Sequence, residues 1–295
     1  MSIVHAIVLG ITQGFSEFLP ISSSGHLLLV PWLFGWDDFA GQPDLERTFD
    51  VALHLGTLVG AISYFRHDLL GLVGAALGSL RRRPPVRSAT GPAGGNGADV
   101  PAAGPPEARL AWLLLASALP AAAIGAAFED SFTSLAQAEW AIGMLLIGFG
   151  LVLAWADRLG GLRPAEAFGV RDVLFMGLAQ AVALAPGVSR SGVTITAGRS
   201  LGFSRDGAAR LAFLMSLPIT FGALLYKGLD LVEDPSLLDG LEGAFVAGVL
   251  TSGITGWLAV WGTLRFIRTH TFRPFVIYRV VVGLLVIVAA ASPWR

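Results

Sequence analysis

The sequence predicts an all-α polytopic membrane protein with six transmembrane helices plus two oppositely oriented re-entrant helical hairpins, arranged as an inverted-topology repeat. Three observations predict this fold class: an apolar composition, six long apolar stretches, and two further apolar stretches that are broken near the middle. Of the 295 residues, 54% are hydrophobic and 14% are charged, against roughly a quarter charged in an ordinary soluble domain. Too little polar surface remains to cover a soluble protein of this length, so membrane lipids are the expected surroundings.

The cysteine count and the net charge exclude several function classes. Because the chain contains no cysteine, it has no disulfide framework, no thiolate metal site and no cysteine nucleophile. A net charge of -1 gives no support for nucleic-acid binding. The N-terminal residues 1–18 lack a basic region and a small-residue cleavage site, so we expect them to stay in the structure rather than to be removed as a signal peptide.

The apolar stretches define the expected membrane elements, since a transmembrane helix needs about 20 mainly apolar residues. Six stretches qualify, near 48–65, 110–128, 140–156, 208–229, 242–264 and 275–292. Two other apolar regions, 2–36 and 172–203, are interrupted by Pro, Gly and Ser and carry polar residues inside. We interpret each of these two regions as a re-entrant hairpin.

The distribution of charge sets the orientation of these elements, because cytoplasmic connections carry an excess of Lys and Arg. Fifteen of the 20 basic residues lie in four places: Arg66, Arg81, Arg82, Arg83, Arg87 and Arg109; Arg158, Arg163 and Arg171; Arg199, Arg205 and Arg210; and Arg265, Arg268 and Arg273. The connections 37–50, 129–139 and 230–242 hold thirteen acidic residues and one base. We expect the four arginine-rich places to be cytoplasmic and the three acidic connections to be external. The two hairpins then enter the membrane from opposite faces and point at each other.

The chain is predicted to be a single membrane domain, 1–295, with repeat 1 at about 1–128 and repeat 2 at about 140–292. Residues 81–108 form a Pro, Gly and Ala tract without hydrophobic periodicity, which indicates a mobile cytoplasmic loop. Small residues at 243–248 (GAFVAG) would allow close helix packing. That packing is compatible with a homodimer or with contacts inside one chain.

An internal repeat supports the inverted topology. A shift of 167 residues superposes GITQGFSEFLPISSSG (10–25) on GLAQAVALAPGVSRSG (177–192) with five identities. Copies that enter from opposite faces would be related by a pseudo-two-fold axis in the membrane plane, as in transporters whose sites lie near the midplane. That architecture would bring both hairpin tips into one cavity.

The first hairpin contains a carboxylate inside an apolar segment. Gln13 and Glu17 are four residues apart and therefore share one helix face, and an ionised carboxylate there is costly unless it is paired or hydrated. One interpretation is a metal ligand or a general acid/base. The alternative is a glutamate at a helix end that reaches water or caps the serine-rich turn.

The turn at 20–26 (PISSSGH) ends at a predicted helix start, where free backbone N–H groups favour an anion. The hydroxyls of Ser22, Ser23 and Ser24 next to Gly25 suit phosphate oxygens, although serines also cap helices without further function. His26 at the same turn is either a structural histidine or a candidate nucleophile or general base.

The turn at 186–192 (PGVSRSG) places Arg190 between Ser189, Ser191 and Gly192. Arginine suits bidentate phosphate contact, and the alternative is a structural ion pair with Glu17. Together the two turns supply a carboxylate, an imidazole, hydroxyls and a fixed cation, a set suited to phosphoryl transfer. Asp50 and His54, four residues apart, are weaker candidates that either assist or only face an aqueous vestibule.

The motifs QGFSEFLPISSSGH (13–26) and PGVSRSG (186–192) resemble the two signatures of the bacterial undecaprenyl pyrophosphate phosphatase (undecaprenyl-diphosphatase, bacitracin-resistance) family. The similarity includes FDVALHLGTL (49–58) and covers nearly the whole chain except 81–108. Where some members carry two glutamates this chain has Gln13, which leaves Glu17 as the main acid.

The resemblance implies hydrolysis of undecaprenyl pyrophosphate to undecaprenyl phosphate and inorganic phosphate, with a divalent cation, Mg²⁺ or Ca²⁺, held through Glu17. It implies recycling of the lipid carrier for cell-wall synthesis, bacitracin resistance, and a multi-pass location in the bacterial inner membrane with the site open to the periplasmic face. Catalysis would fall to Glu17, His26, Ser23 and Arg190, with either Ser23 or His26 as the nucleophile. The remaining polar and small residues of both turns would bind substrate: Gln13, Ser22, Ser24, Gly25, Ser189, Ser191 and Gly192.

Two other function classes fit parts of the pattern. Inverted repeats and broken helices are also typical of transporters, so a transporter or flippase of a polyprenyl phosphate or another anionic substrate is the alternative. The tripeptide Ser24-Gly25-His26 hints at the phosphatidic-acid-phosphatase type. Against that type, no Lys-x6-Arg-Pro precedes the tripeptide and no histidine follows Arg190 at the required distance.

Overall fold

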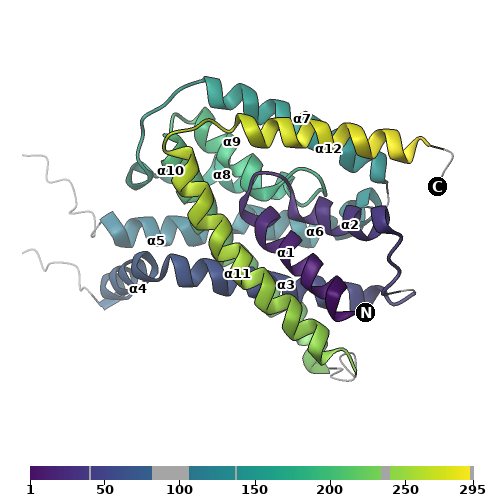
Figure 1. Ribbon diagram of the computed structural model, residues 1–295. Coiled ribbons are helices and arrows are strands. Elements are labelled where there is room, and N and C mark those ends of the chain that lie inside the picture. Colours follow the sequence, from purple (N-terminus) through teal and green to yellow (C-terminus); the bar gives the residue numbers. More distant parts are fainter. Residues whose placement is uncertain (40, 82–105, 137, 234–239, 293–295) are drawn as a thin grey trace, which may run out of the picture.

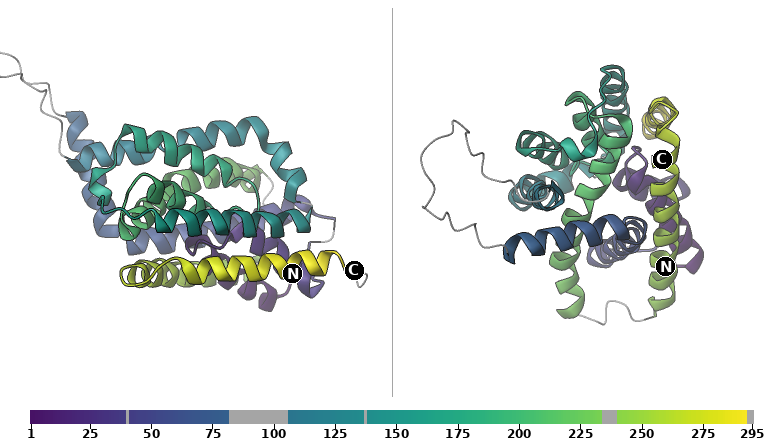
Figure 2. Two further views of the ribbon diagram at one scale, coloured as in Figure 1. Left: turned by 90° about the horizontal axis from the view of Figure 1, so that it is seen from above. Right: turned by 90° about the vertical axis from the view of Figure 1, so that its left-hand side faces the viewer.

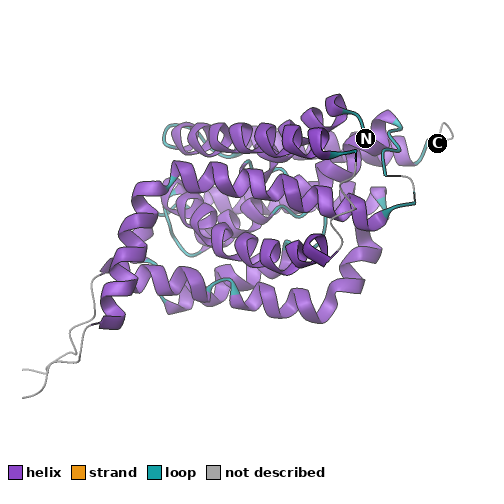
Figure 3. Ribbon diagram, turned by 90° about the horizontal axis from the view of Figure 1, so that it is seen from below, coloured by secondary structure: helices purple, strands orange, loops and turns teal. Residues whose placement is uncertain are grey.

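The computed structural model describes residues 1–39, 41–81, 106–136, 138–233 and 240–292, and within these ranges it contains helices and no strand (Figure 3). The helices are α1 (Ile3–Phe18), α2 (Ser23–Phe34), α3 (Pro43–Tyr64), α4 (Arg66–Arg81), α5 (Pro106–Ala116), α6 (Leu119–Ala136), α7 (Glu139–Arg158), the 3-10 turn η1 (Ala165–Ala167), α8 (Val170–Val182), α9 (Arg190–Ser200), α10 (Arg205–Glu233), α11 (Glu242–Ile267) and α12 (Arg273–Ala290). The all-α prediction is confirmed for the described part of the chain.

Five helical stretches are long and apolar enough to cross a membrane: Pro106–Ala127, Glu139–Arg158, Arg205–Tyr226, Glu242–Ile267 and Arg273–Ala290. A sixth is formed if α3 and α4, which meet at a bend of 82°, are taken as one broken span. These stretches overlap the six predicted crossings in sequence, and the structure supports five or six candidate spans by length and composition. The predicted crossing at 110–128 is interrupted within one candidate span, because α5 ends at Ala116 and α6 begins at Leu119. Most of the predicted mobile loop 81–108 lies outside the described residues.

Two pairs of short helices, α1 with α2 and α8 with α9, occupy the two broken apolar regions. The second helix of each pair begins with the same cap. The Ser22 hydroxyl accepts the Gly25 amide and the Ser189 hydroxyl accepts the Gly192 amide, as serine N-caps do. Ser22 and Ser189 have φ of 80° and 74°, a left-handed conformation that is uncommon outside glycine. The two residues are equivalent in the 167-residue internal repeat, so the copies share backbone geometry as well as residue identity.

Helix α11 holds the N-terminal half of the molecule together. It crosses α1 and α3 diagonally (Figure 1), and glycines make the approach close. A Cβ on Gly14 would lie 2.7 Å from the Ser252 carbonyl oxygen, and one on Gly56 would lie 2.3 Å from that of Val249. Small residues at such crossings let helix backbones approach in lipid, where no hydrophobic drive pulls helices together. Gly248, in the small-residue stretch 243–248 of α11, also packs on Phe49 and Leu53 of α3. Part of that stretch therefore makes helix contacts within the chain.

The C-terminal half is built around α7 and α12, which run side by side (Figures 1 and 2). Their contact is reciprocal: a Cβ on Gly143 would lie 2.8 Å from the Gly283 carbonyl oxygen, and a Cβ on Gly283 would lie 2.6 Å from that of Gly143. The largest apolar core lies between these halves and includes Phe65, Ile195 and Phe213. The backbone approach of α7 and α12 leaves no room for a side chain at either glycine.

Gly143→Ala is expected to lower the stability of the protein by about 1–3 kcal/mol, because the added methyl forces two backbones apart. Gly148→Ala on the same helix is the matched control, since a Cβ there meets nothing within 4 Å. That control should be neutral or stabilising, because alanine favours helix by about 1 kcal/mol over glycine. The measurement is thermal unfolding in detergent micelles. Equal melting temperatures for the two variants would contradict the reciprocal contact.

Candidate active site

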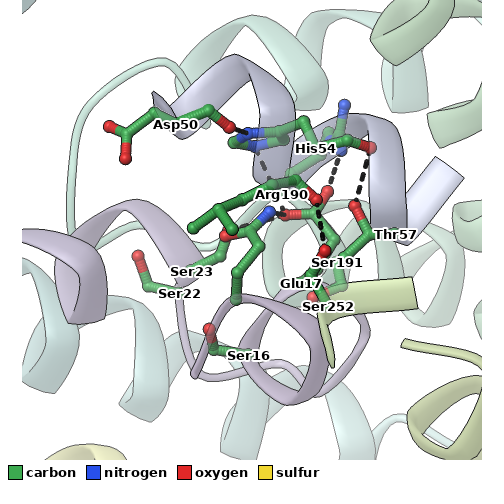
Figure 4. A network of polar contacts seen from close by, with 12 residues as sticks. Ser16, Glu17, Ser22, Ser23, Asp50, His54, Thr57, Arg190, Ser191 and Ser252 are labelled. Atoms are coloured by element: carbon green, nitrogen blue, oxygen red, sulfur yellow. Dashed lines mark hydrogen bonds and ion pairs between the residues drawn. The ribbon is translucent and has the colours of Figure 1, made fainter. Parts of the chain in front are cut away.

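A buried carboxylate, Glu17, is the centre of a polar network (Figure 4). Its side chain is 5% exposed. One oxygen, Oε1, pairs with the Arg190 guanidinium. The other, Oε2, accepts the Ser23 hydroxyl at 2.7 Å and the Gln13 amide at 3.2 Å, and His54 Nε2 lies 3.7 Å away. The network therefore holds one carboxylate between two basic side chains and one hydroxyl.

Three of these side chains converge because they sit at or near helix ends. Glu17 is in the last turn of α1, Ser23 is the first residue of α2 and Arg190 is the first residue of α9. His54 comes from the middle of α3 and is oriented by its Nδ1, which donates to the Asp50 carbonyl at 2.8 Å. The guanidinium also lies at the N-terminus of α9, where the helix dipole favours anions.

Direct hydrogen bonds join the turn at 20–26 to the turn at 186–192. The Ser22 hydroxyl accepts the Gly187 amide at 3.1 Å in addition to its capping bond, and the Ser191 hydroxyl donates to the Leu19 carbonyl at 3.0 Å. Gly25 permits this approach, since a Cβ there would be 3.4 Å from Gly187 Cα. Sequence analysis left open whether Arg190 pairs with Glu17, and the structure shows that it does.

His26 is held away from Glu17. Its Nδ1 lies 2.6 Å from the Ser22 carbonyl oxygen, and its Nε2 lies 2.8 Å from the Tyr278 hydroxyl. Because a carbonyl only accepts, Nδ1 carries a hydrogen, and in the neutral ring Nε2 then accepts from Tyr278. The Ser23 hydroxyl donates to Glu17 and not to the imidazole, both of whose nitrogens have other partners.

One acceptor atom beside Glu17 has no partner. Gln13 is fully buried, and its Oε1 makes no hydrogen bond although its amide nitrogen bonds Glu17. A buried polar atom left unpaired costs roughly 1–3 kcal/mol, so buried acceptors normally bind a protein group, a water, an ion or a ligand. Gln13 thus provides a free oxygen next to the carboxylate.

Comparison with known proteins identifies the family of this chain. Residues 6–285 match the family described as bacitracin resistance protein BacA. A protein of Pelotomaculum thermopropionicum named undecaprenyl-diphosphatase is 42% identical over 99% of this chain and 98% of its own length. Proteins of the same name from Pelobacter propionicus and Desulforudis audaxviator are each 44% identical, covering 96% and 98% of this chain and 95% and 98% of their own. The chain belongs to the bacitracin resistance protein BacA family.

In this BacA-family chain, the site residues expected from the sequence fall into two groups. Gln13, Ser23 and Arg190 each contact Glu17. The other expected binding residues have structural partners or lie apart: Ser22, Ser189, Ser191, Gly25 and Gly192 build the turns, and Ser24 is exposed. The Asp50 carboxylate points away from the network (Figure 4). The roles assigned to all these residues remain predictions.

Arg279 and Tyr278 of α12 were missed by the sequence analysis. Arg279 is fully buried and donates to the carbonyls of Pro20, Gly187 and Val188 from the two turns, and to those of Leu145 and Leu146 in α7. A signal was available, since an arginine inside the predicted crossing 275–292 is an expensive residue that normally has a function. Its five backbone partners could not be found from sequence. Arg279 therefore fixes both turns against α7.

Arg279→Lys is expected to destabilise the protein by about 2–4 kcal/mol, because an ammonium cannot span the carbonyls that the planar guanidinium reaches. Turnover should fall as well, since both turns lose their common anchor. Arg273→Lys, at an exposed position at the start of the same helix, serves as the control and should change neither property. Thermal unfolding and phosphate release test both variants, and wild-type stability in Arg279→Lys would contradict the anchoring role.

Proposed function

We propose that this chain is an integral membrane phosphatase that hydrolyses undecaprenyl pyrophosphate to undecaprenyl phosphate and inorganic phosphate. The observation that carries the proposal is the network of Glu17, Ser23 and Arg190, which joins a hydroxyl, its proton acceptor and a phosphate-binding cation. Family membership and the names of the relatives support the same activity. The reaction would recycle the lipid carrier for cell-wall synthesis and confer bacitracin resistance.

Substrate binding is the step that activates the network in this proposal. Without substrate, Arg190 occupies one oxygen of Glu17. A pyrophosphate group at the start of α9 competes for the guanidinium, because arginine forms bidentate contacts with phosphate as readily as with carboxylate. Arg190 then neutralises charge on the phosphoryl group while Glu17 is left facing the Ser23 hydroxyl.

The chemical step assigns the nucleophile to Ser23. Its oxygen attacks the terminal phosphorus, its proton passes to Glu17 Oε2, and the bond from that phosphorus to the bridging oxygen breaks. Undecaprenyl phosphate leaves with the bridging oxygen, and water then cleaves the phosphoserine to release inorganic phosphate. The 2.7 Å hydrogen bond from Ser23 to Glu17 is within the reach required of a general base.

His26 is the competing nucleophile. Its Nε2 lies against the Tyr278 hydroxyl, so attack by the imidazole would first require that contact to break. We therefore assign His26 a positioning role, in which the ring ties the turn at 20–26 to α12. A trapped phosphohistidine, stable in alkali and labile in acid, would instead favour His26.

Ser23→Ala should reduce phosphate release from undecaprenyl pyrophosphate at least about 10³-fold, because covalent attack is lost. Ser24→Ala is a matched control in the adjacent residue, which is exposed. Its predicted binding role allows a higher KM, with kcat close to wild type. Release is measured with detergent-purified protein. Substantial turnover by Ser23→Ala would contradict the assignment.

A divalent cation fits the donor atoms at this site. Among the described residues, no three His, Cys, Asp or Glu side chains lie close enough to hold an ion alone, so substrate oxygens must supply most ligands, as is usual for Mg²⁺. Glu17 and the unpaired Gln13 Oε1 would be the protein ligands. When bound, the cation would neutralise charge on the pyrophosphate.

Chelation with EDTA is expected to abolish phosphate release, and added Mg²⁺ or Ca²⁺ should restore it. Gln13→Leu removes the proposed second ligand and should raise the metal concentration needed for half-maximal release, because one oxygen donor is lost. Gln180→Leu, at the equivalent position in the second copy, serves as the control and should leave that concentration unchanged. Full release in EDTA would contradict the cation requirement.

We also propose that α1–α2 and α8–α9 are the two re-entrant hairpins of an inverted repeat. The shared left-handed serine caps support it, as does the reciprocal contact of Gly143 with Gly283. The two glycines are 140 positions apart rather than 167, and residues 81–108, which precede Gly143, account for the shorter offset. If Gly143 and Gly283 are equivalent, α7 belongs to the first copy of the repeat and not to the second, where the boundary at about 140 would place it.

The proposed orientation in the inner membrane places the acidic connections outside and the basic ones in the cytoplasm. Because the chain has no cysteine, single-cysteine labelling tests this directly. Asp44→Cys, at a side chain 81% exposed, should react with a membrane-impermeant maleimide in intact spheroplasts. Leu162→Cys, 92% exposed, should react only after lysis. The reverse pattern would contradict the orientation.

A further inference from the structure

A basic cavity of about 950 Å³ lies at the far end of α9 from Arg190. It is formed where α7 and α11 end and where α10 and α12 begin, at one end of the molecule (Figure 1). Its charged lining residues are Arg158, Arg199, Arg205, Arg268, Arg273, Asp157 and Asp206. Five guanidinium groups against two carboxylates leave an excess of positive charge. By the rise of an α-helix, Arg199 is about 14 Å along α9 from Arg190, so this cavity is separate from the active site.

The two carboxylates of the cavity are already satisfied. Asp157 is bound by Arg205 at 2.6 Å and 3.2 Å, lies 3.7 Å from the buried Arg199, and also accepts the Phe272 amide. Asp206 accepts Arg268 at 3.2 Å. These pairs tie the ends of α7, α9, α10, α11 and α12 together. Arg199, Arg205 and Arg268 are the three arginines in these pairs. Neither carboxylate is then free to neutralise the remaining two arginines of the cavity.

Arg158 and Arg273 are the two remaining cations. Both are exposed, both line the cavity, and within the described part of the chain neither forms an ion pair with a carboxylate. They come from different elements, the last turn of α7 and the first residue of α12. Two unpaired guanidinium groups that face one cavity from two helices match the charge of a phosphate group.

Exposed apolar side chains at and beside the cavity indicate the source of that phosphate. Leu162, which lines the cavity, is 92% exposed, and Trp155 and Leu159 beside Arg158 are also exposed. Trp155 lies one helical turn before Arg158 in a candidate membrane span, and tryptophan favours the level of lipid headgroups. Apolar side chains next to basic ones at a helix end are typical of contact with an anionic lipid rather than with a soluble anion.

We propose that this cavity binds the phosphate of an anionic lipid headgroup in the leaflet at the Arg199 end of α9, with Arg158 and Arg273 as its ligands. Given the orientation proposed above, this leaflet is the cytoplasmic one, whose surface is rich in anionic lipid. The bound lipid would brace the ends of α7 and α12. Those helices carry the Gly143–Gly283 contact and Arg279, the anchor of both active-site turns.

The test titrates full-length protein in zwitterionic detergent micelles with phosphatidylglycerol and counts bound lipid by native mass spectrometry. The Arg158→Gln/Arg273→Gln pair should weaken binding about 30-fold, from the contribution of two basic residues at an anionic surface. Arg171→Gln/Arg265→Gln, which removes two exposed arginines from outside the cavity, is the matched control and should weaken it less than threefold. Phosphate release in micelles should be unchanged in both pairs, which shows that the active site is intact.

Three results would overturn the proposal. Equal weakening in both variant pairs would show a general charge effect and no site. Equal binding of phosphatidylcholine, whose choline cation offsets its phosphate, would show that the cavity does not select a headgroup with net negative charge. Displacement of the lipid by inorganic phosphate at the same concentration would show that the cavity takes a soluble anion. Retained binding in Arg158→Lys/Arg273→Lys would support it.

Discussion

The ion pair between Glu17 and Arg190 is the interaction on which the arrangement of the site depends. Its partners are separated by 173 positions in the chain, and each would be a costly isolated charge in an apolar segment. Pairing brings the end of α1 against the start of α9 and sets Ser23 within hydrogen-bond distance of the same carboxylate. The pair also keeps a phosphate-binding cation and a proton acceptor mutually occupied until an anion separates them.

Arg279 and Ser22 hold the turn after α1 against the turn before α9. The turns at 20–26 and 186–192 leave carbonyls and amides without helical partners, which lipid cannot satisfy. The Arg279 guanidinium donates hydrogen bonds to carbonyls of both turns, and the Ser22 hydroxyl accepts one backbone amide from each turn. The turns are therefore rigid because their backbone groups bond to each other and to α12. A buried guanidinium with five carbonyl acceptors also adds positive charge behind the site.

Much of this could be predicted from the sequence, and the limits have physical reasons. The apolar stretches predicted the helices, and the four-residue spacing predicted that Gln13 and Glu17 share a face, which their 3.2 Å hydrogen bond confirms. Broken apolar regions located both turns. The partners of His26 and Arg279 could not be predicted, because they are a side chain and carbonyls remote in sequence. The break between α5 and α6 had a signal that was overlooked, because Pro120 lacks the N–H that would bond to the Ala116 carbonyl and continue the helix.

The most direct test of the central claim is phosphate release from undecaprenyl pyrophosphate by a charge-swapped protein, Glu17→Arg/Arg190→Glu, measured beside Glu17→Gln and the wild type. The swap keeps an ion pair between the turns but moves the carboxylate away from Ser23. The account predicts that the swapped protein melts within a few degrees of the wild type and releases phosphate at least about 10²-fold more slowly, as Glu17→Gln does. Near-wild-type release by the swapped protein would show that the pair serves only to join the turns, and would contradict the catalytic roles assigned to Glu17 and Arg190.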